Sequence, residues 1–542
     1  MFIKSNFLNF GTLFFQIIKQ IRKLYLNSLF YNKKISKIDD KAITYKPRQN
    51  ILNCIIKFDK KKTNIEDYSL NSVWKKGTNL NYKEFKKLHS FFWLFTLDLK
   101  SSKKITQNII SNWIYENDRY KQDVWDLDVL SKRIIAWISN SRLTYENSDI
   151  NYKLKFNSVI KKQTNHLINE IKSSDKLDDK MIGSTAIILV GLSYEDKYYL
   201  KFGIELLKKI LDLSLDTENF PKSRNLRQLV FYLKYLVVVR EFLKESQTSV
   251  PEFLDETIFY LGKSYTVFSE LGQSLLFNGN HKNDLKEFNK YLSMYKYKFE
   301  NTKNEVGGYA VLKNKNTTLA VDVGNSPPSK FSHNYQSGTL SFEFIYKDRK
   351  LISNSGYFQD YKSKLNLISK STAAHSALII NNHSSCSFRN RGKQKMVENG
   401  LKVSNKNVVN EKNYWLVKAS HNGFLKKFGI LHERSLEYFV EKNKLIGNDK
   451  IISKNGLEKI KYDIRFHMEP GVKLTKTLNN KTILIEIENS GWRFSTNCEI
   501  INIETGIYFG NKNLSSGNQN ICLSGKIKDI NQEIKWVFEK IQ

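Results

Sequence analysis

Cysteine and proline are both scarce in this chain of 542 residues, with four of the former and six of the latter. The cysteines, Cys54, Cys386, Cys498 and Cys522, show no CxxC spacing. Without this spacing neither a zinc ribbon nor a disulfide framework is supported, so we expect buried free thiols. The sequence also lacks a Walker phosphate loop, a GxSxG elbow and an HExxH helix, which removes the enzyme classes that depend on them.

Acidic side chains are few, 54 against 87 Lys and Arg residues, which leaves a formal net charge of +33. A surface of that charge attracts polyanions such as nucleic acid, anionic lipid or an acidic glycan. Abundant Lys, Asn and Ile with little Pro also fit a genome-wide composition bias, which is the simpler explanation. The lysines are scattered rather than blocked, and no nucleic-acid-binding module is present. We therefore expect no nucleic-acid partner.

Long hydrophobic runs are missing too. The apolar run Leu13–Ile18 is too short to span a bilayer. No small-residue cleavage site follows it, and Lys19 comes too soon for a cleavable signal peptide. Two interpretations stay open: a basic amphipathic helix in peripheral contact with a membrane, and a helix packed on the body of the protein, which we favour. The sequence does not fix the oligomeric state.

The first half of the chain has a helical period. Residues 1–80 form an N-terminal extension without sustained periodicity, in which Ile51–Lys57 predicts a short strand. Residues 81–277 place apolar side chains every three or four positions, with Pro251 at a suitable first helical position. Helices are expected over His89–Lys100, Ile105–Tyr115, Leu127–Ser141, Ile160–Ile171, Met181–Leu192, Tyr198–Leu213, Arg227–Lys244 and Pro251–Ser269. Consecutive helices joined by short loops are typical of an array that stacks or closes on itself.

The second half alternates with a period of two. After a polar linker at residues 278–304, short alternating segments run from 305 to 542. Examples are Thr339–Phe344, Ile483–Glu488 and Ile534–Phe538, with turns at Asn422-Gly423 and Asn455-Gly456. This pattern predicts a large antiparallel β-sandwich.

Specific strings narrow the fold further. Residues 321–344 and 350–378 contain a D-x-G turn, L-S-F-E, an N-x-G turn and S-T-A-A-H-S-A-L, in an order and spacing similar to the C-terminal pattern of the heparinase II/III-like family. The matching residues are Asp322, Gly324, Leu340, Ser341, Phe342, Glu343, Asn354, Gly356, Ser371, Thr372, His375 and Leu378. In the helical half, the segments that resemble the family are Leu88–Leu99, Trp125–Ser141, Asn219–Gln228 and Phe277–Gly279.

The resemblance implies an α+β multidomain fold, with an incomplete α/α toroid followed by an antiparallel β-sandwich and a cleft between them. The family belongs to the polysaccharide lyase superfamily that includes alginate lyases. Its characterised members cleave uronic-acid-containing glycans by β-elimination without a cofactor. It thus implies an acidic polysaccharide as partner and a location in the cell envelope or periplasm. A cytoplasmic location stays open, because no clear signal peptide is present.

β-Elimination needs a donor that neutralises the uronate carboxylate, a base for the C5 proton and an acid for the leaving oxygen. His375 matches the family's histidine and would be the base or a carboxylate partner. Asn225 is the candidate neutraliser, with helix capping as the alternative. Tyr265 and Gln336 complete the candidate catalytic set, although for Tyr265 a core or groove-lining role is the alternative that we favour. Arg224, Arg227, His333 and Lys370 are the candidates for binding substrate acid groups.

Two departures weaken the prediction of catalysis. Gln336 stands where the family has a histidine, and an amide cannot transfer protons. Relatives can hold zinc with the residues at 336, 354 and 375, but Gln336 and Asn354 leave only His375 as a good ligand, so no metal is expected. The Tyr-His pair of active relatives is also missing after Ser223. A lyase is therefore the first hypothesis, and a catalytically impaired glycan-binding protein of the envelope is the alternative.

One further histidine motif has a structural explanation. His432 and Arg434 alternate with Glu433 in a segment similar to a hairpin of the family. We expect a structural cross-strand pair with His421 rather than a catalytic group.

Overall fold

The computed structural model describes residues 14, 17–36, 41–56, 81–98, 100–391, 394–453, 460–478, 481–512 and 514–541. The chain forms two compact units. Unit 1 comprises Met1–Leu213 and Lys234–Ile258, and unit 2 comprises Ser214–Leu233 and Phe259–Gln542. The predicted domain boundaries at 80, 277 and 304 stay predictions.

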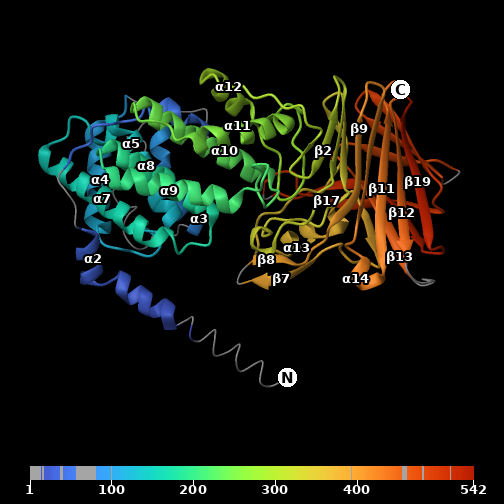
Figure 1. Ribbon diagram of the computed structural model, residues 1–542, viewed down its shortest axis with the longest axis horizontal. Coiled ribbons are helices and arrows are strands. Elements are labelled where there is room, and N and C mark those ends of the chain that lie inside the picture. Colours follow the sequence, from blue (N-terminus) through green and yellow to red (C-terminus); the bar gives the residue numbers. More distant parts are fainter. Residues whose placement is uncertain are drawn as a thin grey trace. The chain divides into compact units, whose positions relative to one another are not determined.

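The helices of the first half follow the predicted periodicity closely. They are α2 (Leu29–Ile35), α3 (Tyr82–His89), α4 (Lys103–Asn117), α5 (Leu127–Ser139), α6 (Ser141–Thr144), α7 (Ile150–Ile171), α8 (Leu177–Ser193), α9 (Lys197–Ser214), α10 (Leu226–Glu245), α11 (Glu252–Ser269) and α12 (Lys286–Met294). Within unit 1, α5 and α7 both pack against α8 (Figure 1). Pro251 lies one position before α11 rather than inside it.

Two local predictions in this half are wrong. The described part of the predicted strand, Ile51–Ile56, is no strand: Gln49–Cys54 forms a 3₁₀ helix, in which Ile51, Leu52 and Cys54 are buried, and Lys57 lies outside the described residues. The segment His89–Lys100 is no continuous α-helix either, since α3 ends at His89 and a 3₁₀ turn at Phe92–Thr96 follows. Both segments are short and apolar, and such runs do not reveal their period.

The segment Trp125–Ser141, which resembles the family, contributes to the core of unit 1. Arg133 is fully buried, stacks 4.2 Å from the ring centroid of Trp113 and donates to the backbone carbonyl of His89 and the side chain of Gln163. Trp113 in turn donates to Nδ1 of His89. Burial, followed by the charge of Arg133, lowers the pKa of His89 to about 3. This cluster is structural, because every group in it is turned inward.

The described N-terminal residues are helical at 17–26 and again in α2. Arg22 pairs with Glu170 of α7 at 2.7 Å, and Tyr31 of α2 shares a hydrogen bond with His166. Among the residues that the structure describes, no helix is both long and apolar enough to cross a bilayer.

The second half consists of antiparallel strands. They are β1 (Glu305–Val306), β2 (Tyr309–Lys313), β3 (Thr317–Asp322), β4 (Phe342–Tyr346), β5 (Arg349–Ser353), β6 (Leu378–Ile380), β7 (Ser387–Arg391), β8 (Gln394–Asn399), β9 (Val403–Asn410), β10 (Tyr414–His421), β11 (Ile430–Phe439), β12 (Lys444–Ser453), β13 (Lys461–Met468), β14 (Lys473–Lys476), β15 (Thr482–Ile487), β16 (Ser490–Thr496), β17 (Ile500–Tyr508), β18 (Ser516–Lys526) and β19 (Asn531–Lys540). The short helices α13 (Lys364–Lys370) and α14 (Leu425–Phe428) lie between strands.

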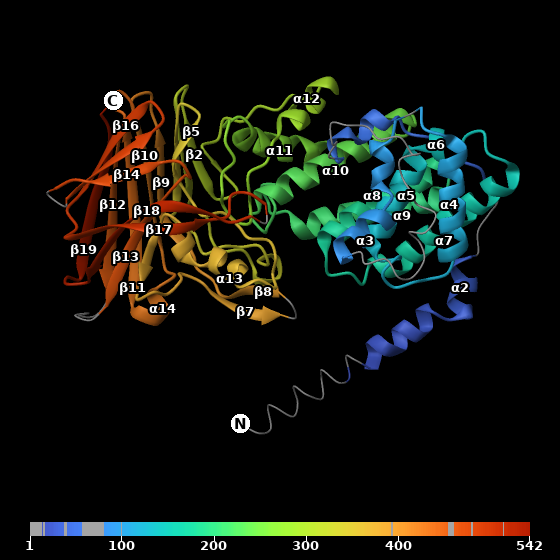
Figure 2. The same cartoon turned by 180° about the vertical axis from the view of Figure 1, so that it is seen from behind.

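These strands form two large sheets and one hairpin. One sheet has the order β1-β2-β3-β4-β5-β13-β18-β17, with β6 also paired to β13. The other has the order β14-β15-β16-β19-β12-β11-β10-β9, and β7 pairs with β8 alone. Figure 2 shows the two sheets layered face to face. This confirms the predicted antiparallel sandwich.

Aromatic side chains from both sheets fill the space between them. Phe342 of β4 stacks on Trp536 of β19 with ring centroids 5.5 Å apart. Phe466 of β13 meets the same tryptophan at 4.7 Å. The alternation predicted in Ile483–Glu488 and Ile534–Phe538 is confirmed by the burial of β15 and β19.

The other β-strand predictions have mixed outcomes. In Thr339–Phe344 the strand begins only at Phe342, because Leu340 has a positive φ of 62°. The predicted turn at Asn422-Gly423 lies between β10 and α14. The turn at Asn455-Gly456 lies outside the described residues.

Candidate functional site

Arg224 fastens the loop between α9 and α10 to the strands of unit 2. Its guanidinium pairs with Asp322 at 2.5 Å and stacks 4.7 Å from the ring centroid of Tyr309. The remaining hydrogen bonds go to the backbone carbonyls of Gly307, Gly308 and Asn325. Burial opposes the charge, but the carboxylate of Asp322 outweighs it and raises the pKa of Arg224. Arg224 was predicted to bind substrate, but its hydrogen bonds go to groups of the protein itself.

Asn225 caps α10 and leaves one amide donor for the site. Its Oδ1 accepts from the backbone N–H of Arg227 at 2.9 Å, which is the geometry of a helix N-cap. Its Nδ2 points at the backbone of Gly279: a Cβ added there would lie 2.8 Å from this nitrogen and 2.8 Å from Cβ of Asn334. Capping and a role in the site are thus compatible, since they use different ends of the amide.

The linker residues Asn278 and Gly279 thread between these groups. Asn278 donates to Asp322 at 3.1 Å and to the hydroxyl of Tyr309 at 2.6 Å. Gly279, at a φ of +82°, donates its N–H to Oε1 of Gln336 at 2.9 Å. Only glycine suits this position, because the backbone has a left-handed conformation and no room for a Cβ.

Gln336 joins three segments of unit 2 by hydrogen bonds. Besides the bond from Gly279, its Nε2 donates to the carbonyls of Gly356 at 2.9 Å and Ser369 at 2.5 Å. The side chain is fully buried. The amide of Gln336 links the backbone at Gly279, Gly356 and Ser369, and both its oxygen and its nitrogen are hydrogen-bonded within the protein.

The residues at the positions of the family's zinc ligands do not fit a metal ion. Asn354 donates to Glu343 and accepts from the N–H of Ser376, so its amide is engaged like that of Gln336. Only His375 offers a nitrogen ligand, and two carboxamides are poor zinc ligands. Across the described ranges, no group of three His, Cys, Asp or Glu residues has the arrangement of a metal site.

His375 is buried and holds a defined tautomer. Its Nδ1 lies 2.9 Å from the carbonyl oxygen of Ser371, so Nδ1 carries the proton. Nε2 has no hydrogen-bond partner, although the residue is only 1% exposed. Burial lowers the pKa of His375 to about 4, against a smaller opposing effect of the Ser371 carbonyl, so the ring is neutral near pH 7. Its face lies against Gly338, where an added Cβ would be 2.4 Å from the ring.

A buried ionic cluster fixes the backbone that carries His375. Arg434 binds Asp449 through both Nε and Nη2, at 2.8 and 3.0 Å, and donates to the carbonyl of Ser376. His432 contacts the same carboxylate at 2.7 Å. Burial opposes ionisation, but Arg434 and His432 lower the pKa of Asp449. His421 lies opposite His432 in the β10–β11 pairing, which agrees with the structural explanation given above.

Lys370 and His333 lie side by side, but the lysine points inward. Its ammonium donates to the carbonyls of His333 at 2.5 Å and Lys395 at 2.9 Å, and the residue is 1% exposed. Burial, with Lys395 nearby, lowers the pKa of Lys370 to about 7. His333 itself is partly exposed. Of these two predicted binding residues, His333 is the one within reach of solvent.

Tyr265 lies apart from the other candidates. It sits in α11, is 2% exposed and donates to Asn289 of α12 at 2.6 Å. Burial raises its pKa. It lines a cavity of about 220 Å³ together with Leu229, Asn280 and Asn289, and not the cluster around His375.

Tyr357 belongs to the cluster and was missed from the sequence. Its hydroxyl donates to Oδ1 of Asn334 at 3.1 Å, and Asn334 also flanks Gly279 beside Asn225. Burial raises the pKa of Tyr357, while Asn366 and the charge of Arg227 act in the opposite sense. Its position directly after the N-x-G turn was a signal, but tyrosines are too common in this chain for that signal to stand out.

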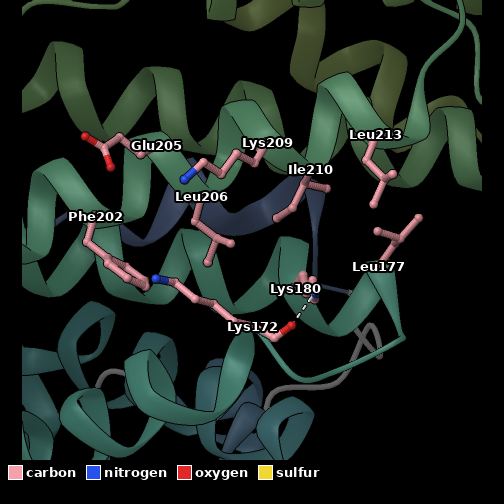
Figure 3. A pocket seen from close by; sticks show the side chains of 9 residues that line it. All are labelled: Lys172, Leu177, Lys180, Phe202, Glu205, Leu206, Lys209, Ile210 and Leu213. Atoms are coloured by element: carbon pink, nitrogen blue, oxygen red, sulfur yellow. Dashed lines mark hydrogen bonds between the residues drawn. The ribbon is translucent and has the colours of Figure 1, made fainter.

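A separate cavity of about 280 Å³ lies in unit 1 between the end of α7 and the helices α8 and α9 (Figure 3). Phe202, Leu206 and Ile210 form its apolar part, and Lys172 lies 5.1 Å from the ring centroid of Phe202. The predicted site residues all lie elsewhere, in unit 2.

The profile of the domain described as "Heparinase II/III-like, C-terminal" matches residues 301–537. Residues 301–537 thus form a heparinase II/III-like C-terminal domain. No curated relative matches the chain.

Solved structures resemble this chain over most of its length. A mutant of the heparan sulfate lyase HepC from Pedobacter heparinus has a TM-score of 0.68 at 14% identity, covering 86% of this chain and 78% of that one. A structure named heparinase III has a TM-score of 0.67 at 13% identity, covering 94% and 88%. At such identities the likeness concerns the fold, which is the expected incomplete α/α toroid followed by an antiparallel β-sandwich.

Proposed function

We propose that this heparinase II/III-like protein cleaves an acidic, uronate-containing polysaccharide by β-elimination. The proposal rests on a set of candidate site residues that lie near one another within unit 2. Asn225 and Tyr357 meet at Gly279 and Asn334, and Gln336 and Gly338 connect this point to His375. The fold is that of solved heparan sulfate lyases, and the net charge of +33 suits a polyanionic substrate.

The hydrogen bonds that Asn225 and His375 make within the protein indicate which of their atoms remain available for substrate. The Nδ2 of Asn225 is the donor for the uronate carboxylate, because Oδ1 is committed to the helix cap. Neutral His375 has its lone pair on Nε2 and is the base for the C5 proton. We assign to Tyr357 the return of a proton to the leaving O4, and to the partly exposed Arg227 and His333 the binding of substrate acid groups. Such a substrate fits an envelope location.

A panel of uronate polymers tests the activity. β-Elimination leaves an unsaturated uronate, so we expect new ultraviolet absorbance with at least one polymer. His375→Ala should abolish it, while His383→Ala, which removes an exposed histidine, should leave the rate unchanged. Equal rates in both variants would remove His375 from the mechanism.

Asn225→Asp provides a sharper variant. An aspartate keeps the oxygen that caps α10 but replaces the donor with a negative charge beside the substrate carboxylate. We expect kcat to fall by roughly 10²–10³ with unchanged thermal stability. A wild-type rate in a well-folded variant would contradict the assigned role.

The second candidate is a glycan-binding protein without cleavage. It is favoured by the burial of His375 and by Gln336, whose amide is saturated and transfers no protons. Binding of a uronate polymer without any new absorbance, weakened by Arg227→Ala, would support this alternative over the lyase.

A further inference from the structure

The N-terminal helix of unit 1 presents apolar side chains to solvent. We define the N-terminal apolar face as Phe14, Ile17, Ile18, Ile21, Leu24 and Tyr25, whose exposed fractions run from 39% to 73%. At 100° per residue these six positions fall within an arc of about 120° on the helix. The face continues into α2, where Leu29 and Phe30 are 70% and 71% exposed. Large apolar side chains gathered in this way mark an interaction surface.

The opposite side of the same helix is fixed to the protein. Arg22 binds Glu170 of α7 at 2.7 Å and donates to the hydroxyl of Ser173 at 3.2 Å. Leu26 and Tyr31 are buried. Figure 1 shows the blue helix running away from α2. The exposed face is therefore not the side by which the helix is attached.

The charged side chains of these two helices all have one sign. Lys19 and Lys23 lie on the polar side of the helix, opposite the apolar face, and Lys33 and Lys34 follow in the last turn of α2. No Asp or Glu occurs in residues 1–38. Two copies of such a surface repel each other, whereas an anionic lipid surface offers both negative headgroups and a hydrocarbon layer.

We propose that the N-terminal apolar face binds the surface of a membrane that contains anionic lipids. The helix lies in the interfacial plane, with Ile21 and Leu24 at the acyl chains and Lys19 and Lys23 at the headgroups. Unit 1 is held at the membrane through the Arg22–Glu170 pair. The inference is independent of the reaction proposed for unit 2.

Flotation of the full chain with lipid vesicles tests the proposal. We expect binding to vesicles of phosphatidylcholine with phosphatidylglycerol and far less to phosphatidylcholine alone. Ile21→Asp should lower the partition coefficient roughly tenfold or more, because the isoleucine loses its burial in the acyl layer. The matched control is Ile530→Asp, since Ile21 is 61% and Ile530 62% exposed.

Further outcomes decide between lipid and other occupants. Lys19→Glu with Lys23→Glu should weaken binding to the anionic vesicles, and added salt should do the same. Equal binding to both vesicle types, or none to either, overturns the proposal. So does a dimer in light scattering that Ile21→Asp converts to a monomer, because the face would then be a contact between two copies. Unchanged thermal unfolding of Ile21→Asp shows that the fold is intact.

Discussion

At the scale of single residues, the buried ions of unit 2 act as fasteners. Arg224 holds Asp322 through one hydrogen bond, and Arg434 holds Asp449 through two. Removing such a buried cation lowers the free energy of unfolding strongly, because the partner carboxylate remains buried without a counter-ion. These arginines therefore decide where nearby loops lie.

We expect Arg224→Met to lower the free energy of unfolding by about 3–5 kcal/mol, since Asp322 would lose its cation and three carbonyls their donor. Urea denaturation measures the effect. The matched control is Arg349→Met, which breaks an exposed pair with Glu488 and should cost about 1 kcal/mol or less. Similar losses in the two variants would contradict the fastening role.

The sequence singled out candidate site residues but not their surroundings. His375 and Gln336 were found because they stand in a motif with fixed spacing. That Lys370 points inward, and that Arg224 is fully engaged, depends on carbonyls from segments far along the chain. Such contacts leave no local pattern in a single sequence.

At the scale of elements, the secondary structure was predicted correctly where a periodic segment is long or alternates regularly. It was predicted wrongly where a short apolar run shows no period. The helices α4 to α11 repeat over three or more turns, apart from the four-residue α6, and β15 and β19 alternate cleanly. The 3₁₀ helix Gln49–Cys54 was taken for a strand because its apolar residues are consecutive. Its backbone bonds run locally, from Ile51 to Arg48 and from Ile55 to Leu52.

The packing of β12 on β19 gives a prediction at this scale. A Cβ at Gly447 would lie 2.0 Å from the ring of Trp536 in the sandwich core. We expect Gly447→Ala to destabilise the protein by about 1–3 kcal/mol, because this ring has no room to retreat. Gly517→Ala in β18 is the control, since nothing lies within 4 Å of that site. Thermal unfolding that shifts equally in both variants would refute the packing argument.

At the scale of the whole molecule, buried histidines link stability to pH. Burial lowers the pKa of His89, His166 and His467 to about 3 and that of His375 to about 4, from an ordinary value of 6.5. Between pH 6.5 and pH 4 the unfolded chain binds protons that the folded chain does not. Both compact units contain such residues.

We therefore expect the free energy of unfolding to fall steadily as the pH drops from 6.5 to 4, by several kcal/mol at roughly 1.4 kcal/mol per unit of pKa. Urea titrations at half-unit intervals of pH measure the slope. As the control, His383→Ala removes a solvent-exposed imidazole and should show the same slope as the wild type. A flat profile over this range would contradict the burial of neutral imidazoles.

The engagement of Arg224 also limits how this protein can be divided or recombined. A fragment beginning at residue 301 contains every strand of the sandwich, yet it lacks both the guanidinium that neutralises Asp322 and the amide of Asn278. Such a fragment would carry a bare anion in its interior. Grafting the β-module into another protein therefore requires that residues 214–233 and 277–281 travel with it.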